Sequence, residues 1–154
     1  LTFAANSSTV AFTGNGARRL LCGSSRTFNT VTAAGGTNAS ILIQCSTSTI
    51  TTLTPAAQNR LLFSSGGTVT VTTFTVISAS ISTPVLITSD GPTNGVATVS
   101  SANNFTCDYC GVAGMTFSGG GIFAATNSYN FGQNTGITIT NPSIGGGGGR
   151  IIGG

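Results

Sequence analysis

Residues 68–78 read TVTVTTFTVIS, a stretch that alternates threonine with valine, phenylalanine and isoleucine. Because successive side chains of a β-strand point to opposite faces, this alternation predicts a strand with one apolar face and one hydroxyl-bearing face. Turn-forming clusters of Gly, Asn, Ser and Pro separate it from similar stretches. No segment has helical periodicity, so the sequence predicts an all-β fold. The other alternating stretches are 8–14, 39–45, 48–54, 84–89, 95–101 and 136–140.

Composition narrows the functional classes. The chain has 154 residues, which favours one domain, and its 39% apolar content argues against disorder. Only 5% of the residues are charged, and Lys, Glu, His and Trp are absent. Arg18 and Arg19 are the only adjacent basic residues, so the basic stripe of nucleic-acid-binding proteins is missing. No apolar run is long enough for a membrane helix. We therefore expect neither nucleic acid nor membrane as a partner.

The spacing of the strands favours a β-solenoid over a β-sandwich or jelly roll, which remains the alternative. Small β-branched residues dominate the strands, and such residues stack in ladders when coils lie one above another. Segments of strand, short turn and strand recur at roughly 20–30 residues, the usual length of a solenoid coil. Cys22 and Cys45 are 23 positions apart, or about one coil, which would place them side by side.

Both halves of the chain resemble known β-solenoid proteins. Residues 8–54, from STVAFTGNG to TITTLT, resemble coils of bacteriophage and bacterial surface solenoids. The second half resembles a module of tailed-phage structural proteins. The matching segments are Leu61–Phe63, SDGPTNG, VATVSSANNF, CDYCGVAGMTF, SGGGIFAA and NSYNFGQNTGITIT. The CDYC sequence and the lack of Trp depart from that pattern. The resemblance implies a right-handed parallel β-helix in a fibre, spike or capsid-decorating protein of a virion.

The same resemblance implies the partners. We expect other virion proteins and further copies of this chain, with a trimer as one arrangement, and a host surface glycan as a further candidate. A secreted or cell-surface solenoid with ice-binding or adhesive function is the alternative. Threonine at every second position in TVTVTTFT and TSTITTLT resembles ice-binding surfaces, although Thr also suits solvent-facing strand positions. The segments PVLITS and GVATVSS are expected to interrupt such an array.

Catalytic residue types are scarce. Glycoside hydrolysis needs two carboxylates, and the chain has only Asp90 and Asp108. Asp90 lies in SDGPTNG, where we expect it to cap its own turn. Without His, Glu or Lys the usual general acids and bases are missing. A lyase using Tyr109 with an arginine is conceivable, but nothing in the spacing singles it out. The sequence therefore predicts no catalytic site, no enzyme activity and no cofactor.

The cysteines are interpreted as structural. Cys107 and Cys110 form a CxxC pair, which alone is a weak zinc signal because structural zinc takes four ligands. In a strand these two side chains would point to opposite faces, so only one could reach the core. Three interpretations stay open: small core hydrophobes, a Cys22–Cys45 disulfide or close stack, and a metal site. We predict no metal site.

The end of the chain is rich in aromatic residues and then in glycine. We expect the aromatic residues to stack in the core and cap the last coil rather than bind glycans. They are Phe105, Tyr109, Phe117, Phe123, Tyr129 and Phe131.

Residues 1–140 are predicted to form the solenoid, closed by GITIT, and residues 141–154 are predicted to form an assembly tail. Because five glycines are costly to order and a sheet edge needs covering, the tail should dock on a neighbouring subunit or fold over its own last coil. Ile144, Ile151 and Ile152 would anchor it, and Arg150 would bind carboxylates or carbonyls.

Overall fold

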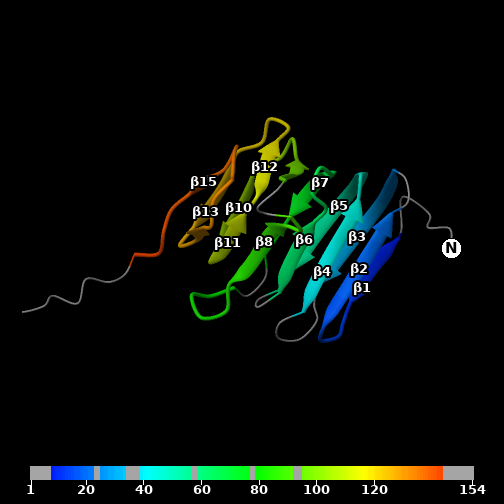
Figure 1. Ribbon diagram of the computed structural model, residues 1–154, viewed down its shortest axis with the longest axis horizontal. Helices are drawn as coiled ribbons and strands as arrows, with labels where there is room; N and C mark the ends of the chain where they lie inside the picture. The colour runs from blue at the N-terminus through cyan, green and yellow to red at the C-terminus, as the bar shows by residue number, and fades with distance from the viewer. Residues whose placement is uncertain are drawn as a thin grey trace, which may run out of the picture.

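The protein is a parallel β-solenoid of about five turns (Figure 1). The computed structural model describes residues 8–22, 25–33, 39–56, 59–76, 79–91 and 95–143. Within these ranges the structure is all-β, and every pairing between named strands is parallel. The sequence prediction of a solenoid is confirmed, and the sandwich alternative is wrong.

Three sheets run along the stack. Neighbouring strands in each sheet come from successive turns, because one turn carries the chain once round the coil. The first sheet contains β1 (Thr9–Phe12), β3 (Arg26–Ala33), β5 (Thr47–Pro55), β7 (Thr68–Phe74), β9 (Ala97–Ser100) and β12 (Met115–Ser118). The second contains β2 (Ala17–Cys22), β4 (Ser40–Cys45), β6 (Arg60–Phe63), β8 (Val85–Ser89), β11 (Cys110–Ala113) and β14 (Tyr129–Asn130). The third contains β10 (Phe105–Asp108), β13 (Phe123–Thr126) and β15 (Thr138–Ile139).

Strands β3, β5 and β7 pass round a corner of the coil. In β7, Val71 and Phe74 are both buried and the two threonines between them are exposed. A regular strand would place residues three apart on opposite faces. The pairing of β5 with both its neighbours is interrupted at Thr51. These strands therefore contribute to two faces of the coil. Strand β10 contacts β7, with the rings of Phe74 and Phe105 4.4 Å apart, and so continues the second of these faces.

Turn length varies along the stack. Thr68 is paired on one side with Thr47, in the turn before it, and on the other side with Thr98, in the turn after it. Phe105 pairs with Phe123 across one of the last turns. The number of residues between paired positions is largest from Thr68 to Thr98 and smallest from Phe105 to Phe123. The extra residues lie in the connections between strands, so the strands keep their pairing while the loops absorb the difference. The repeat is therefore regular in space and irregular in sequence.

The core consists of columns of apolar side chains that run along the stack. In the second sheet Ile41, Leu61, Ile87 and Val112 pair in successive turns, and each is at most 1% exposed. Complete burial of an aliphatic side chain of this size contributes about 1.5–3 kcal/mol. Since each turn covers the column of the turn before it, the alternating apolar positions of the sequence become one continuous core.

Corners of the last two turns use left-handed backbone. Tyr109 joins β10 to β11 with φ 55°, and Asn127 follows β13 one turn later with φ 46°. Gly114 and Gly132 repeat the same device at a second corner, with φ 64° and 99°. A left-handed residue breaks the alternation of side chains. Residues on its two sides can therefore both face the core.

Candidate functional site

The most regular surface feature is a first threonine face on the first sheet. Thr47, Thr68, Thr98, Thr116 and Thr135 pair in succession and form one column across successive turns. A parallel column two residues further along the strands contains hydroxyl side chains throughout. Together they place T-x-T or T-x-S in register on β5, β7, β9 and β12. The second column is Thr27, Thr49, Thr70, Ser100 and Ser118.

A second threonine face lies around the corner, on the other part of β3, β5 and β7. Its first column is Thr9, Thr30, Thr52 and Thr73, which pair in successive turns. Its second column begins at Ala11, and the backbone N–H of Thr75 extends it by donating to the carbonyl of Leu53. All these threonines are half-buried or exposed. The members of the second column after Ala11 are Thr32, Thr54 and Thr75.

The expected interruption of this array is wrong. The segment PVLITS forms β8, which belongs to the second sheet and leaves the threonine faces untouched. The segment GVATVSS contains β9, whose Thr98 and Ser100 extend the first threonine face in register. The array therefore covers more turns than the two clean threonine runs of the sequence indicate. Cross-strand Thr–Thr pairs also stabilise the sheet, by about 0.2–1 kcal/mol each.

Asp90 holds two turns of the solenoid together. Its Oδ1 accepts a hydrogen bond of 2.6 Å from the backbone N–H of Ser65, which belongs to the turn after β6 in the preceding coil. In its own turn, the N–H of Gly91 donates instead to the hydroxyl of Ser89, at 3.3 Å. Asp90 therefore caps a turn as the sequence predicts, but the turn that it caps is in the preceding coil and not its own.

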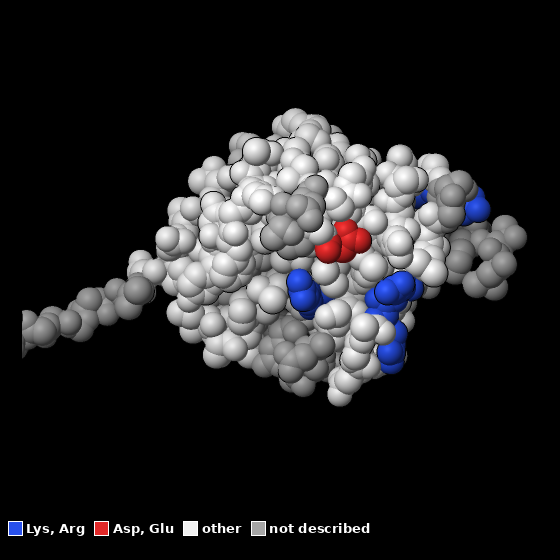
Figure 2. Space-filling model, viewed as in Figure 1, with Lys and Arg blue, Asp and Glu red and all other residues white. Residues whose placement is uncertain are grey.

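Asp108 has a similar structural position at the end of β10. Its Oδ1 accepts hydrogen bonds of 2.9 Å from the Thr126 hydroxyl and from the Asn127 side-chain amide. Both partners lie in the next turn, whereas the partner of Asp90 lies in an earlier one. Each carboxylate thus joins two turns at a corner, and among the described residues the two have no hydrogen-bonding partner in common. Charge is sparse on the face of the molecule that Figure 2 shows.

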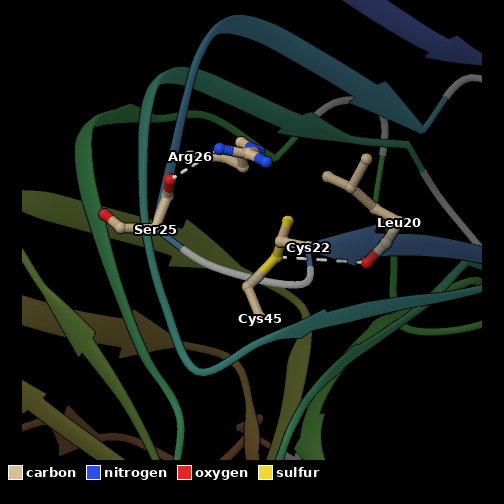
Figure 3. The surroundings of a disulfide bond; sticks show 5 residues. All are labelled: Leu20, Cys22, Ser25, Arg26 and Cys45. Carbon is tan, nitrogen blue, oxygen red and sulfur yellow. Dashed lines mark hydrogen bonds between the residues drawn. A yellow bond between two sulfur atoms is a disulfide. The ribbon is translucent and has the colours of Figure 1, made fainter. Parts of the chain in front are cut away.

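Cys22 and Cys45 form a disulfide (Figure 3). The two residues are direct partners in the pairing of β2 with β4, and their Cα atoms are 4.7 Å apart. This confirms that their separation of 23 along the chain corresponds to one turn. The sulfur of Cys45 also lies 4.0 Å from the Leu20 carbonyl oxygen. The bond therefore joins the first two turns covalently, inside the coil, where both cysteines are buried.

Cys107 and Cys110 are free thiols, and both are buried. The prediction that only one could face the core is wrong, because left-handed Tyr109 lies between them and breaks the alternation. A hydrogen bond with the Cys107 side chain, followed by burial, raises the pKa of the Cys110 thiol far above its usual range. The thiol therefore stays protonated. In the part of the chain that the structure describes, no group of three or more His, Cys, Asp or Glu side chains could hold a metal ion.

Five of the six aromatic residues of the last third divide into two groups, and the sixth, Tyr109, is half-buried at the corner between β10 and β11. Phe105, Phe117 and Phe123 pack together in the core as the sequence predicts, with ring centroids 5.2–6.4 Å apart; Phe105 stacks on Phe117, and Phe123 is tilted against both. Tyr129 and Phe131 instead lie on the surface, 40% and 62% exposed, so their assignment to the core is wrong. The reason is their register. Tyr129 pairs with Gly111 on β11, at a position that faces outward, and Phe131 lies two residues further on the same face.

Several predictions concern residues outside the described ranges. Ile144, Arg150, Ile151 and Ile152 are among them, so the docking of the tail and the domain boundary at residue 140 stay predictions. Across the ranges that are described, no helix is long and apolar enough to cross a membrane. In comparisons with known proteins, no family model, curated protein or solved structure matches the chain.

Proposed function

We propose that this chain is a non-enzymatic structural protein of a virus particle, as a capsid-decorating or tail-fibre component. The observation that carries the proposal is the C-terminal end of the stack. Among the described strands, β14 pairs only with β11, and β15 pairs only with β13. Their outer edges are therefore open to pairing with another chain. The terminal turn of a solenoid must be covered to be soluble, and a docking partner in an assembly provides that cover.

The body of the solenoid supports a role based on shape. Every turn is paired to the next along its strands, the first two turns share a disulfide, and the core columns are continuous. The carboxylates of Asp90 and Asp108 hold corners of the coil together, and this structural role supports a non-enzymatic function. Hydroxyl faces and few charges suit a stiff module that keeps its form outside the cell.

The test is to purify virus particles from cells that produce the chain and to count its copies by quantitative mass spectrometry. We expect a fixed number of copies per particle. A variant that lacks residues 143–154 should keep its β-type circular dichroism but be lost from the particles. If the complete chain is not found in particles, the proposal is wrong. If the shortened chain enters at the normal number, the tail is not the docking element.

Ice binding is a second candidate, and the threonine faces favour it specifically. A crystal surface needs a flat, rigid and periodic partner. The first threonine face has columns that repeat about every 4.8 Å from turn to turn and about 6.6 Å along each strand. Each threonine presents one hydroxyl and one methyl group, so such a face can order water without binding it as strongly as charged groups would.

This candidate is tested by measuring thermal hysteresis and ice recrystallisation. If the first threonine face binds ice, Thr70→Tyr should abolish both effects, because a bulky ring in the middle of the face separates it from the crystal. Gln44→Tyr, at an exposed position of the second sheet, is the matched control and should retain both effects. Thr52→Tyr tests the second threonine face in the same way. A wild-type chain without either effect would exclude ice binding.

A further inference from the structure

A groove of about 510 Å³ lies at the C-terminal end of the second sheet. Its walls come from three separate parts of the chain: the loop before β8, strand β14 with the residue that follows it, and the segment after β15. In Figure 1 these are the green loop below β8 and the orange-red end of the coloured chain. We call it the aromatic groove. Its lining residues are Ile81, Tyr129, Asn130, Phe131, Asn141 and Pro142.

The two rings of the groove are nearly parallel and stack on each other. The planes of Tyr129 and Phe131 differ by 15°, and their centroids are 6.1 Å apart. Gly111 lies beneath the Phe131 ring: a Cβ atom at that position would approach the ring to 2.7 Å and the Leu86 side chain to 2.6 Å. The absence of a side chain at Gly111 therefore lets Phe131 lie down on the sheet. With 62% of Phe131 exposed, the ring faces solvent on its other side.

Amide groups stand beside this pair of rings. Asn130 Oδ1 accepts hydrogen bonds from the Gly132 N–H, at 2.9 Å, and from the Asn134 amide, at 2.8 Å. These bonds hold the Asn130 amide in place, while its Nδ2 group has no partner among the described residues. The Asn141 amide likewise makes no hydrogen bond within that part of the chain. The groove therefore offers free donors and an acceptor next to two exposed rings.

We propose that the aromatic groove binds a neutral saccharide. A sugar ring has one apolar face of C–H groups that can lie against an aromatic ring, and hydroxyl groups at its rim that need hydrogen-bonding partners. The aromatic groove supplies both, with a few polar groups to orient a ligand on a mainly apolar surface. None of its lining residues is charged, so the site favours a neutral sugar over an acidic one. This proposal does not depend on the proposed role in a virus particle.

The test uses the complete chain and a panel of neutral hexasaccharides, namely cellohexaose, maltohexaose, chitohexaose and mannohexaose, with an oligogalacturonate as the acidic comparison. Binding is measured by calorimetric titration and by amide chemical shifts. We expect at least one neutral probe to bind with a dissociation constant in the millimolar range or below, and more tightly than the acidic one. Phe131→Ala should weaken that binding at least tenfold. Ile122→Ala removes an apolar side chain that is 68% exposed outside the groove and should leave binding unchanged.

A second variant guards against a folding defect. Tyr129→Ala should weaken binding as Phe131→Ala does, and circular dichroism of both variants should match that of the wild type. The proposal is overturned if no neutral probe binds, if the acidic probe binds more tightly, or if both variants bind as the wild type does. It is also overturned if sedimentation shows a dimer that Phe131→Ala converts to monomers while no probe binds. In that case the pair of rings is a contact between copies of this chain.

Discussion

Replacing Cys22 and Cys45 together by alanine should destabilise the protein by removing the covalent link between its first two turns. The disulfide closes a loop whose ends are separated by 23 along the chain. For a loop of this length, the loss of chain entropy in the unfolded state corresponds to about 3.4 kcal/mol at 25 °C. In a chain of this size each kcal/mol shifts the melting temperature by about 2–4 °C, so a decrease of about 7–14 °C is expected.

The assay is thermal unfolding followed by circular dichroism, with and without dithiothreitol. Reduction should lower the melting temperature of the wild type to near that of the double variant and should leave the double variant unchanged. The matched control is Cys107→Ala with Cys110→Ala, which removes the free thiols and should keep the response to reduction. A thiol titration in denaturant should find two free thiols before reduction and all four afterwards.

Two results would refute this reasoning. Four reactive thiols before reduction would mean that Cys22 and Cys45 are not bonded. A double variant that melts within about 2 °C of the wild type would mean that the unfolded chain gains little freedom when the link is lost.

Further predictions concern the last turns. Phe105→Ala removes a ring that is 2% exposed and stacks on Phe74, and should lower the free energy of unfolding in urea by about 3–5 kcal/mol. Gly136→Ala places a side chain at φ 73° against the backbone of Phe117, and should cost about 1–3 kcal/mol in the same assay. Cys110 should resist iodoacetamide at pH 8 until the protein is unfolded, because its native pKa is raised. For the same reason the free energy of unfolding should fall as pH rises above about 8.5, where the unfolded chain releases a proton that the native thiol keeps, and Cys110→Ala should remove that part of the decrease.

The strands themselves follow from local pattern. In residues 68–74 every second position is apolar until the corner, and the structure buries Val69 and Val71 as that pattern predicts. The pairing of Cys22 with Cys45 also follows from spacing, since two residues one turn apart in a solenoid must be neighbours. The weaker pattern of residues 17–22, ARRLLC, concealed β2, because Arg18 and Arg19 occupy its exposed start. The sequence by itself therefore determined the class of fold and the proximity of Cys22 and Cys45, whereas the disulfide between them was established by the structure.

The register of the stack was decided only by the tertiary structure. The turns of this solenoid differ in length, and the alternation of side chains within a strand does not show how many residues its neighbouring loops contain. Only the folded chain aligns Thr98 with Thr68 and thereby extends the first threonine face. The corners could not be predicted from the sequence either. The left-handed backbone of Tyr109 lets Cys107 and Cys110 both face the core, against the alternation of an ideal strand.

The aromatic groove depends on the same cause. Nothing in the sequence distinguishes Phe131, on the surface, from Phe123, in the core, since both follow a glycine-rich or polar turn. Phe123 is buried because β13 pairs it with Phe105 in a column of core rings. Phe131 is exposed because β14 pairs Tyr129 with Gly111 at an outward-facing position, and Phe131 follows on the same face. Local sequence sets which residues can form strands, but the side of the coil that each one faces is set by contacts with the preceding turn, which are long-range in sequence.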